Sequence, residues 1–337
     1  MPAAIIGDRA SGKTTFLGLL YNAMVTFSTK LEGKDFFRYY ADPNTVRSMG
    51  GLYTTLKSKN WPDATLKRQI QKINFLFGYL KTTSTFIPER YRGKIFKNPF
   101  ATIGFTVYDV AGEDIQEMVS SADGSRIGES LSETARLLLD SRVLVILVDC
   151  SKITRDPESK EFKMLLEYDT TMASLVSLIA FHNSKKSDPK ERKIYPVIVF
   201  TKFDRIDKSV LEKMRLEPRY PPYMGSSGIY YTQDEKRRLY GKTILSTYYQ
   251  QLAALLKGGL IKGVSFDEAV YFFSEVHTEV HPETGKEVPS LKETEKGAFE
   301  VNYSYPEYAG FIRYFRRIVD EMPDEIREEQ EFTKPES

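Results

Sequence analysis

Short apolar segments rich in β-branched and aromatic residues alternate along the chain with longer segments whose apolar residues recur every three or four positions. The short segments are typical of strands buried on both faces of a sheet. They predict strands at Ala3–Ile6, Ile103–Tyr108, Arg142–Val148, Tyr195–Phe200 and Ala269–Phe273. The longer segments predict helices at Thr15 to about Thr26, Ser130–Leu139, Glu158–His182, Asp234–Leu256 and Tyr308–Glu321. This alternation predicts an α/β protein with a mostly parallel sheet and helices on both faces.

Other parts of the chain exceed what such a sheet needs. Residues 34–102, 205–233 and 277–306 are expected to be insertions, and loops of this kind often carry partner specificity. Periodicity predicts a helix near Thr65–Lys81 in the first insertion, and Pro282-Glu283-Thr284-Gly285 predicts a hairpin turn in the last. We expect one domain over residues 1–322, followed by a disordered acidic tail over residues 323–337.

Composition narrows the class of protein. The chain has 48 Lys and Arg against 46 Asp and Glu among 337 residues, so overall charge offers no reason to expect a nucleic-acid partner. The single cysteine, Cys150, rules out an intrachain disulfide framework and is expected to be buried. Apolar runs fall short of the roughly 18 residues of a membrane span, which predicts a cytoplasmic protein without an integral membrane segment.

The first chemical motif follows the first predicted strand. Gly7 to Thr14 fit the phosphate-loop pattern G-x-x-x-x-G-K-[ST]. Glycines allow backbone N–H groups to approach phosphate oxygens, Lys13 would reach the β- and γ-phosphates, and the Thr14 hydroxyl would bind Mg²⁺. The N-terminus of the next helix adds positive potential. The predicted nucleotide-binding residues here are Asp8, Arg9, Ala10, Ser11, Gly12, Lys13, Thr14 and Thr15.

The second motif is Asp109-Val110-Ala111-Gly112-Glu113, directly after the strand that ends at Tyr108. It has the form D-x-x-G. A carboxylate at this place can hold a water of the Mg²⁺ shell, and the backbone N–H of Gly112 can donate to a γ-phosphate. By itself the pattern is also typical of an ordinary turn after a strand, but its position after a phosphate loop favours the functional interpretation.

The third motif, Thr201-Lys202-Phe203-Asp204, follows the strand at Tyr195–Phe200 and matches [NT]-K-x-D. An aspartate can accept both donors of guanine, the ring N–H and the exocyclic amine, whereas adenine presents a different pattern. The aliphatic part of Lys202 can lie on the base. With the other two motifs, this one predicts that Thr201, Lys202 and Asp204 select a guanine nucleotide, GTP or GDP.

In this order and spacing the motifs resemble those of the Ras-like, translation-factor-related class of phosphate-loop GTPases. The resemblance implies a Ras-like G domain that binds GTP or GDP with Mg²⁺, acting as a molecular switch or slow GTP hydrolase with an unidentified protein effector or activator. It also implies that Ser274, with Glu275 beside it, touches the guanine O6, although Glu275 and Val276 depart from the usual pattern.

A narrower resemblance concerns the first switch. Asp-x-Ala-Gly-Glu and the segment Trp61-Pro62-Asp63-Ala64-Thr65 are similar to the DO-type, or double-GTPase-like, group. That resemblance implies that Thr65 binds Mg²⁺ and the γ-phosphate. The same interval holds further candidate threonines, at positions 45, 54, 55, 82, 83, 85 and 102.

The residues predicted to act in hydrolysis are Lys13, Thr65, Glu113 and Arg9. Glu113 stands where the Ras-like pattern often has a water-orienting glutamine; it can align water or be repelled by the phosphates, so turnover is expected to be slow. Arg9 can supply a cation to the triphosphate or face solvent. The sequence leaves two other functions open: a phosphate-loop ATPase or small-molecule kinase, and a scaffold that keeps its nucleotide without hydrolysing it.

Overall fold

The computed structural model describes residues 2–8, 10–30, 37–41, 43–63, 71–80, 100–109, 138–154, 156–188, 192–216, 235–258 and 261–321. Their centre is an eight-stranded sheet in the order β2-β3-β4-β1-β5-β6, with β7 and β8 both paired to β6. The strands are β1 (Pro2–Gly7), β2 (Phe37–Ala41), β3 (Gln71–Leu80), β4 (Phe100–Asp109), β5 (Val143–Asp149), β6 (Lys193–Thr201), β7 (Ser265–Phe266) and β8 (Val270–Ser274).

Pairing in the sheet is mainly parallel. Strands β4, β1, β5, β6 and β8 run parallel to one another, and β6 also pairs in parallel with β7. The pairs β2–β3 and β3–β4 are antiparallel. The α/β class with a mostly parallel sheet, predicted from the alternation of strands and helices, is therefore confirmed.

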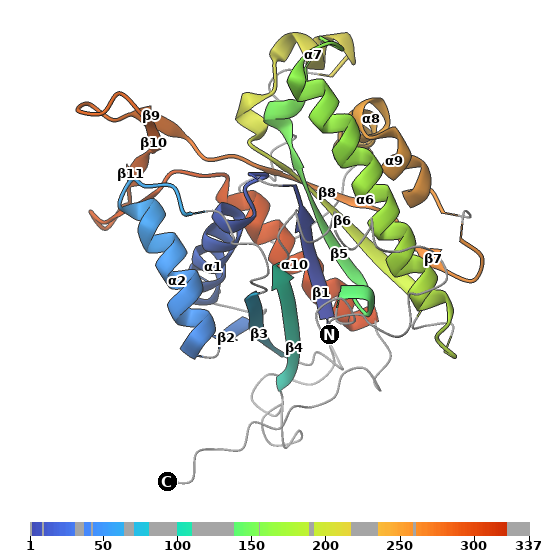
Figure 1. Cartoon of the computed structure of the whole chain (residues 1–337). Coiled ribbons are helices and arrows are strands. Elements are labelled where there is room, and N and C mark those ends of the chain that lie inside the picture. The colour runs from blue at the N-terminus through green and yellow to red at the C-terminus, as the bar shows by residue number, and fades with distance from the viewer. Residues whose placement is uncertain are drawn as a thin grey trace.

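Helices cover both faces of this sheet (Figure 1). They are α1 (Lys13–Lys30), α2 (Pro43–Lys57), α6 (Lys160–Ser184), α7 (Lys208–Lys213), α8 (Glu235–Tyr248), α9 (Gln250–Leu256) and α10 (Tyr305–Glu321). Alternate strand residues point to opposite faces. Ala4 and Ile6 of β1 therefore join one core with α6 to α9, while Ala3 and Ile5 join the other with α1, α2 and α10. This period of two produces a three-layer molecule.

The prediction of a helix near Thr65–Lys81 is wrong for residues 71–80, the part of this range that the structure describes. Gln71–Leu80 form strand β3, which pairs along its whole length with β4 and extends the sheet beyond β1. The alternating apolar residues Ile73, Phe75 and Phe77 suit a strand, and cross-strand pairing with β4 prevailed over the helical pattern. The predicted insertion at 34–102 therefore contributes strands to the central sheet.

The predicted helix Asp234–Leu256 is divided into α8 and α9 at Tyr249, whose backbone leaves the helical region. Asp169 of α6 provides the physical reason. Its two carboxylate oxygens accept hydrogen bonds from the backbone N–H groups of Gln251 and Leu252, at 2.9 Å each, and so satisfy the first turn of α9. Tertiary contact with α6 therefore decides where the second helix begins.

We expect Asp169→Ala to lower the free energy of unfolding by about 2 kcal/mol, because the backbone N–H groups of Gln251 and Leu252 lose an acceptor that is almost fully buried. Asp169→Asn keeps one carbonyl acceptor and should lose about half as much. Urea unfolding followed by far-UV circular dichroism measures both. Equal stability of wild type and Asp169→Ala would show that this contact does not support α9.

The other predicted helices agree with the structure with small shifts of their ends: α1 begins two residues earlier than expected, α6 covers Lys160–Ser184, and α10 begins at Tyr305. Of Ser130–Leu139, only Leu138 and Leu139 are described as helical, and residues 130–137 lie outside the described part. Cys150 is buried as expected, and burial raises the pKa of its thiol well above the ordinary value.

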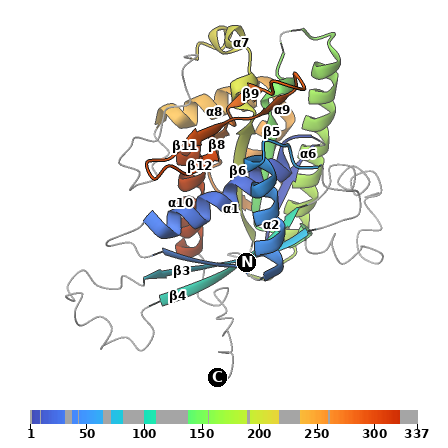
Figure 2. The same ribbon diagram turned by 90° about the vertical axis from the view of Figure 1, so that its left-hand side faces the viewer.

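The predicted hairpin turn around Pro282–Gly285 is confirmed. It joins β9 (Thr278–Val280) to β10 (Glu287–Pro289) in an antiparallel pair. A second hairpin pairs β11 (Leu291–Glu293) with β12 (Phe299–Val301). Figures 1 and 2 show both hairpins outside the central sheet, and β9–β10 at the end opposite to the one where β1 begins. Residues 217–233 of another predicted insertion, and the tail at 323–337, lie outside the described residues.

Within the described residues, α6 has the length and composition that a membrane-crossing helix would need. Its side chains Leu165, Met172, Leu175 and Ile179 are buried in the core, and core helices of soluble proteins commonly pass the same test. No clear integral membrane segment is therefore found in the described part of the chain.

Candidate functional site

Polar residues of the sequence motifs lie at the carboxyl ends of the parallel strands. Register pairs Asp149 of β5 with Thr201 of β6, and Thr201 with Ser274 of β8. Gly7 ends β1, and Asp109 ends β4 on the other side of it. The chain leaves β1 toward β4 but leaves β5 toward β6, so its connections diverge between β1 and β5. Such a switch point, at the carboxyl ends of parallel strands, is where ligands bind in open α/β sheets.

The loop after β1 has the backbone form of an anion-binding turn. Ala10 and Gly12 have positive φ angles, 62° and 85°, on either side of Ser11. Alternation of this kind turns successive N–H groups toward one side of the loop. Helix α1 begins immediately afterwards at Lys13, so its positive end lies at the loop. A side chain at Gly7 would collide with Ser11 Oγ, at 2.6 Å from an added Cβ, which explains the glycine there.

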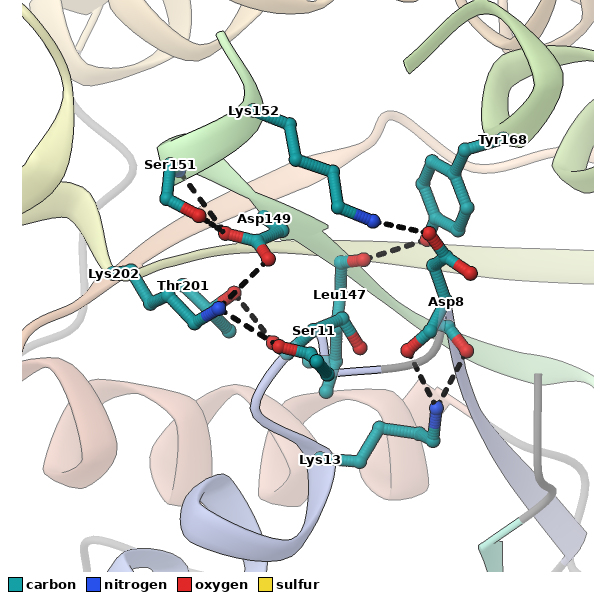
Figure 3. Close-up of polar contacts among 12 residues, drawn as sticks. Asp8, Ser11, Lys13, Leu147, Asp149, Ser151, Lys152, Tyr168, Thr201 and Lys202 are labelled. Carbon is teal, nitrogen blue, oxygen red and sulfur yellow. Dashed lines mark hydrogen bonds and ion pairs between the residues drawn. The ribbon is translucent and has the colours of Figure 1, made fainter. Parts of the chain in front are cut away.

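Lys13 is almost fully buried, with 7% of its surface exposed. Its Nζ donates to the backbone oxygens of Gly7 at 2.6 Å and Asp8 at 3.0 Å, so the ammonium is held against its own loop (Figure 3). Ser11 Oγ is also buried and makes no hydrogen bond within the described residues. A buried hydroxyl of that kind is available to a ligand.

The segment after β6 is hydrogen-bonded to the loop after β1. Thr201 Oγ1 donates to Ser11 O at 2.7 Å, and Lys202 Nζ donates to Ala10 O at 2.8 Å. Lys202 itself has a left-handed backbone, with φ 50°. The first and third motifs of the sequence therefore form one connected structure, although Ser11 and Thr201 are 190 positions apart.

Asp149, Lys152 and the carboxylate of Asp8 also belong to this site, and sequence reasoning missed the first two. Asp149 is 3% exposed; its Oδ2 accepts from Lys202 Nζ at 2.8 Å and its Oδ1 from Ser151. Lys152 forms an ion pair with Asp8 of the loop (Figure 3). An acidic residue directly after the predicted strand Arg142–Val148 was the available signal, because such a residue lies at the carboxyl edge of a parallel sheet.

Asp204 and Glu275 lie close enough for the negative charge of one to act on the other. Asp204 follows Lys202 in a short 3₁₀ turn, Phe203–Arg205. Burial raises the pKa of the Asp204 carboxyl, and its own backbone N–H, Arg205 and His277 oppose that shift. Burial raises the pKa of Glu275 to about 7, and the negative charges of Asp204 and Glu307 add to the shift. Ser274 is buried, and its hydroxyl shares a 2.6 Å hydrogen bond with Tyr308.

The other predicted site residues are only partly described. Thr14 and Thr15 are partly buried in the first turn of α1. Asp109 is described as the last residue of β4, in register with Ile5 of β1. Arg9, Thr65, Gly112 and Glu113 lie outside the described residues.

Comparison with known proteins gives no further identification, since neither the protein-family models nor the curated proteins contain a match to this chain.

Proposed function

We propose that this protein is a Ras-like GTP-binding protein and slow GTPase that uses Mg²⁺ and acts as a nucleotide-dependent switch. The observation that supports it best is the hydrogen bonding of Thr201 and Lys202 to Ser11 and Ala10 of the loop after β1. That connection sets the Gly7–Thr14 loop beside the T-K-x-D segment at the switch point of the sheet. A triphosphate and a guanine ring could then bind side by side.

The residues fit a nucleotide on local grounds. The positive-φ loop, the buried Ser11 hydroxyl and the N-terminus of α1 suit phosphate oxygens. In this proposal, Lys13 turns its ammonium from the Gly7 and Asp8 carbonyls to the phosphates, at little cost in conformational freedom because its stem is already packed. Asp204 accepts the guanine donors, and Ser274 and Glu275 lie near O6.

Thr14 and Asp109 are the described residues that would hold Mg²⁺, with Thr65 as a further proposed ligand. Hydroxyl and carboxylate oxygens are the donors that Mg²⁺ prefers. The ion would neutralise phosphate charge when bound. Arg9 and Glu113 remain proposed contributors to hydrolysis, and Gly112 a proposed γ-phosphate contact. A cytoplasmic location and a protein effector or activator are part of the same proposal.

The deciding experiment is calorimetric titration of nucleotide-free protein with GTP, GDP and ATP in Mg²⁺, for wild type and Asp204→Asn. We expect wild type to prefer guanine nucleotides and the variant to lose about 100-fold of that preference, because the amide presents a donor to guanine donors. A xanthine nucleotide, which has a carbonyl in place of the exocyclic amine, should bind the variant better than wild type.

Asp207→Asn is the matched control. This substitution makes the same change in charge three residues after Asp204. The Asp207 carboxylate caps α7 by accepting from Ser209 N at 2.8 Å. It should leave base preference unchanged. ATP binding equal to or stronger than GTP binding in wild type would overturn the proposal and favour an ATPase or small-molecule kinase.

A further inference from the structure

Arg205, which follows the proposed guanine-binding residue Asp204, contacts both Asp204 and the β9–β10 hairpin. Arg205 Nε lies 3.2 Å from Asp204 Oδ2, and Arg205 Nη2 forms an ion pair with Glu287 of β10. Thr278 of β9 joins both: Arg205 Nη2 donates to its hydroxyl at 3.5 Å, and that hydroxyl donates to Glu287 Oε1 at 2.5 Å. One guanidinium therefore connects the candidate base site to the β9–β10 hairpin.

The hairpin is well anchored at its stem. Backbone hydrogen bonds join Ser290 N to His277 O at 2.8 Å and His277 N to Asn302 O at 2.9 Å. On its other side, Trp61 Nε1 donates to Glu287 O at 2.9 Å, and Lys59 pairs with Glu279 at 2.6 Å. A carboxylate carried on this frame can hold Arg205 in one place.

We propose that Arg205 is a positioning residue for base recognition and that Glu287 anchors it, which makes the β9–β10 hairpin part of the guanine site. This inference rests on the proposed function. Each carboxylate oxygen has two lone pairs, so Asp204 Oδ2 can accept from Arg205 and from guanine at once. The arginine fork, held at its far end by Glu287, limits the rotation of the Asp204 side chain and keeps both oxygens aimed at the base.

The charges around Asp204 agree with this arrangement. Burial raises the pKa of the Asp204 carboxyl, and its own backbone N–H, Arg205 and His277 oppose that shift, so Arg205 favours the ionised form, which accepts hydrogen bonds. Hydrogen bonds from Arg205 and Thr278 hold the pKa of Glu287 below its ordinary value. The side chains of Arg205 and Glu287 are 41% and 45% exposed, so the pair contributes little to folding. Its effect is expected in base preference instead of stability.

The experiment compares binding of GDP and inosine diphosphate to Arg205→Ala, Glu287→Ala and the double variant. The two nucleotides differ only in the exocyclic amine, so changes at the phosphate site cancel in the ratio of their affinities. We expect that ratio to fall about fivefold in each single variant, and no further in the double variant, because the two side chains act as one unit. Glu279→Ala, which removes the Lys59 pair from the same hairpin, should leave the ratio unchanged.

Trp61 is the only tryptophan in the chain, and its indole N–H donates to the backbone oxygen of Glu287, so its fluorescence can follow changes at the hairpin. GDP should change its fluorescence in wild type, and the change should shrink in Arg205→Ala at saturating GDP. Unchanged affinity ratios in both single variants, or a fluorescence change of full amplitude in Arg205→Ala, would overturn the inference. Asp204→Asn in the same assay separates the two proposals: if it abolishes the preference for GDP while the hairpin variants do not alter it, only this inference fails; if it has no effect, the proposed function fails.

Discussion

Lys13→Ala is expected to weaken binding of GTP and GDP about 100-fold, since in the proposed complex its buried ammonium donates charge-assisted hydrogen bonds to phosphate, which contribute about 3 kcal/mol. In the structure this ammonium is already desolvated and bonded to the Gly7 and Asp8 carbonyls at the start of α1. The same contacts mean that its stem needs no further ordering on binding. Calorimetric titration with GDP in Mg²⁺ measures the loss.

Lys57→Ala provides the control for overall charge. Lys57 is exposed in the last turn of α2, so its loss makes the same change in net charge without touching the loop. GDP affinity should stay within about twofold of wild type. If Lys13→Ala bound GDP as tightly as Lys57→Ala, the loop would not be a phosphate site.

Glu307→Gln is expected to lower the free energy of unfolding by about 3 to 5 kcal/mol, because it leaves a buried guanidinium without its counter-charge. Arg237 is 1% exposed and pairs with Glu307, which is 6% exposed. Arg237 also donates to Tyr271 O at 3.0 Å and lies over the ring of Phe273, whose backbone N–H donates to Glu307 at 2.9 Å. Urea unfolding at pH 7.5 measures the change.

At low pH, Arg237→Met should lower the free energy of unfolding less than Glu307→Gln does. The Glu307 carboxyl left behind by the first change can take up a proton and become neutral, whereas the Arg237 guanidinium left behind by the second cannot lose its charge. Burial already raises the pKa of Glu307, and Arg237 is the largest influence that lowers it, so removing the arginine raises that pKa further. The folded variant then holds a proton that the unfolded chain releases above about pH 4.3. Its stability should therefore increase as pH falls from 8 to 5, and a loss independent of pH would contradict this account.

This pair matters for the site as well as for stability. Glu307 begins the buried end of α10 and holds Phe273 N, one residue before Ser274 and two before Glu275. Partial loosening of β8 in these variants should therefore also reduce the affinity for GDP. This affinity is measured without denaturant, at a temperature well below the unfolding midpoint. The part of the candidate site that holds Ser274 and Glu275 is supported from the core.

The α/β class and several of its elements could be predicted from the sequence. The predicted strands Ala3–Ile6, Arg142–Val148, Tyr195–Phe200 and Ala269–Phe273 correspond to β1, β5, β6 and β8. Continuous apolar runs of this length are characteristic of strands covered on both faces, so local composition sufficed. The hairpin turn at Pro282–Gly285 was predictable because turn residues act through their own backbone.

Elements that depend on distant partners were not predictable in this way. Gln71–Leu80 form a strand because β4 offers a full-length antiparallel ladder. Helix α9 begins where it does because Asp169 of α6 accepts from its first N–H groups. Neither the partner strand nor the partner carboxylate can be seen in the local pattern.

The candidate site likewise has features that the local sequence predicts and features that depend on distant residues. From the sequence alone came the phosphate-loop pattern at Gly7–Thr14, the T-K-x-D segment at 201–204 and the prediction that they cooperate. Only the tertiary structure showed that Lys202 bridges Ala10 and Asp149, that Lys152 pairs with Asp8, and that Arg205 reaches Glu287. The residues of each motif are close in sequence because they form a single backbone turn. The charged residues that orient the side chains of a motif can come from any strand end or hairpin that folding brings near.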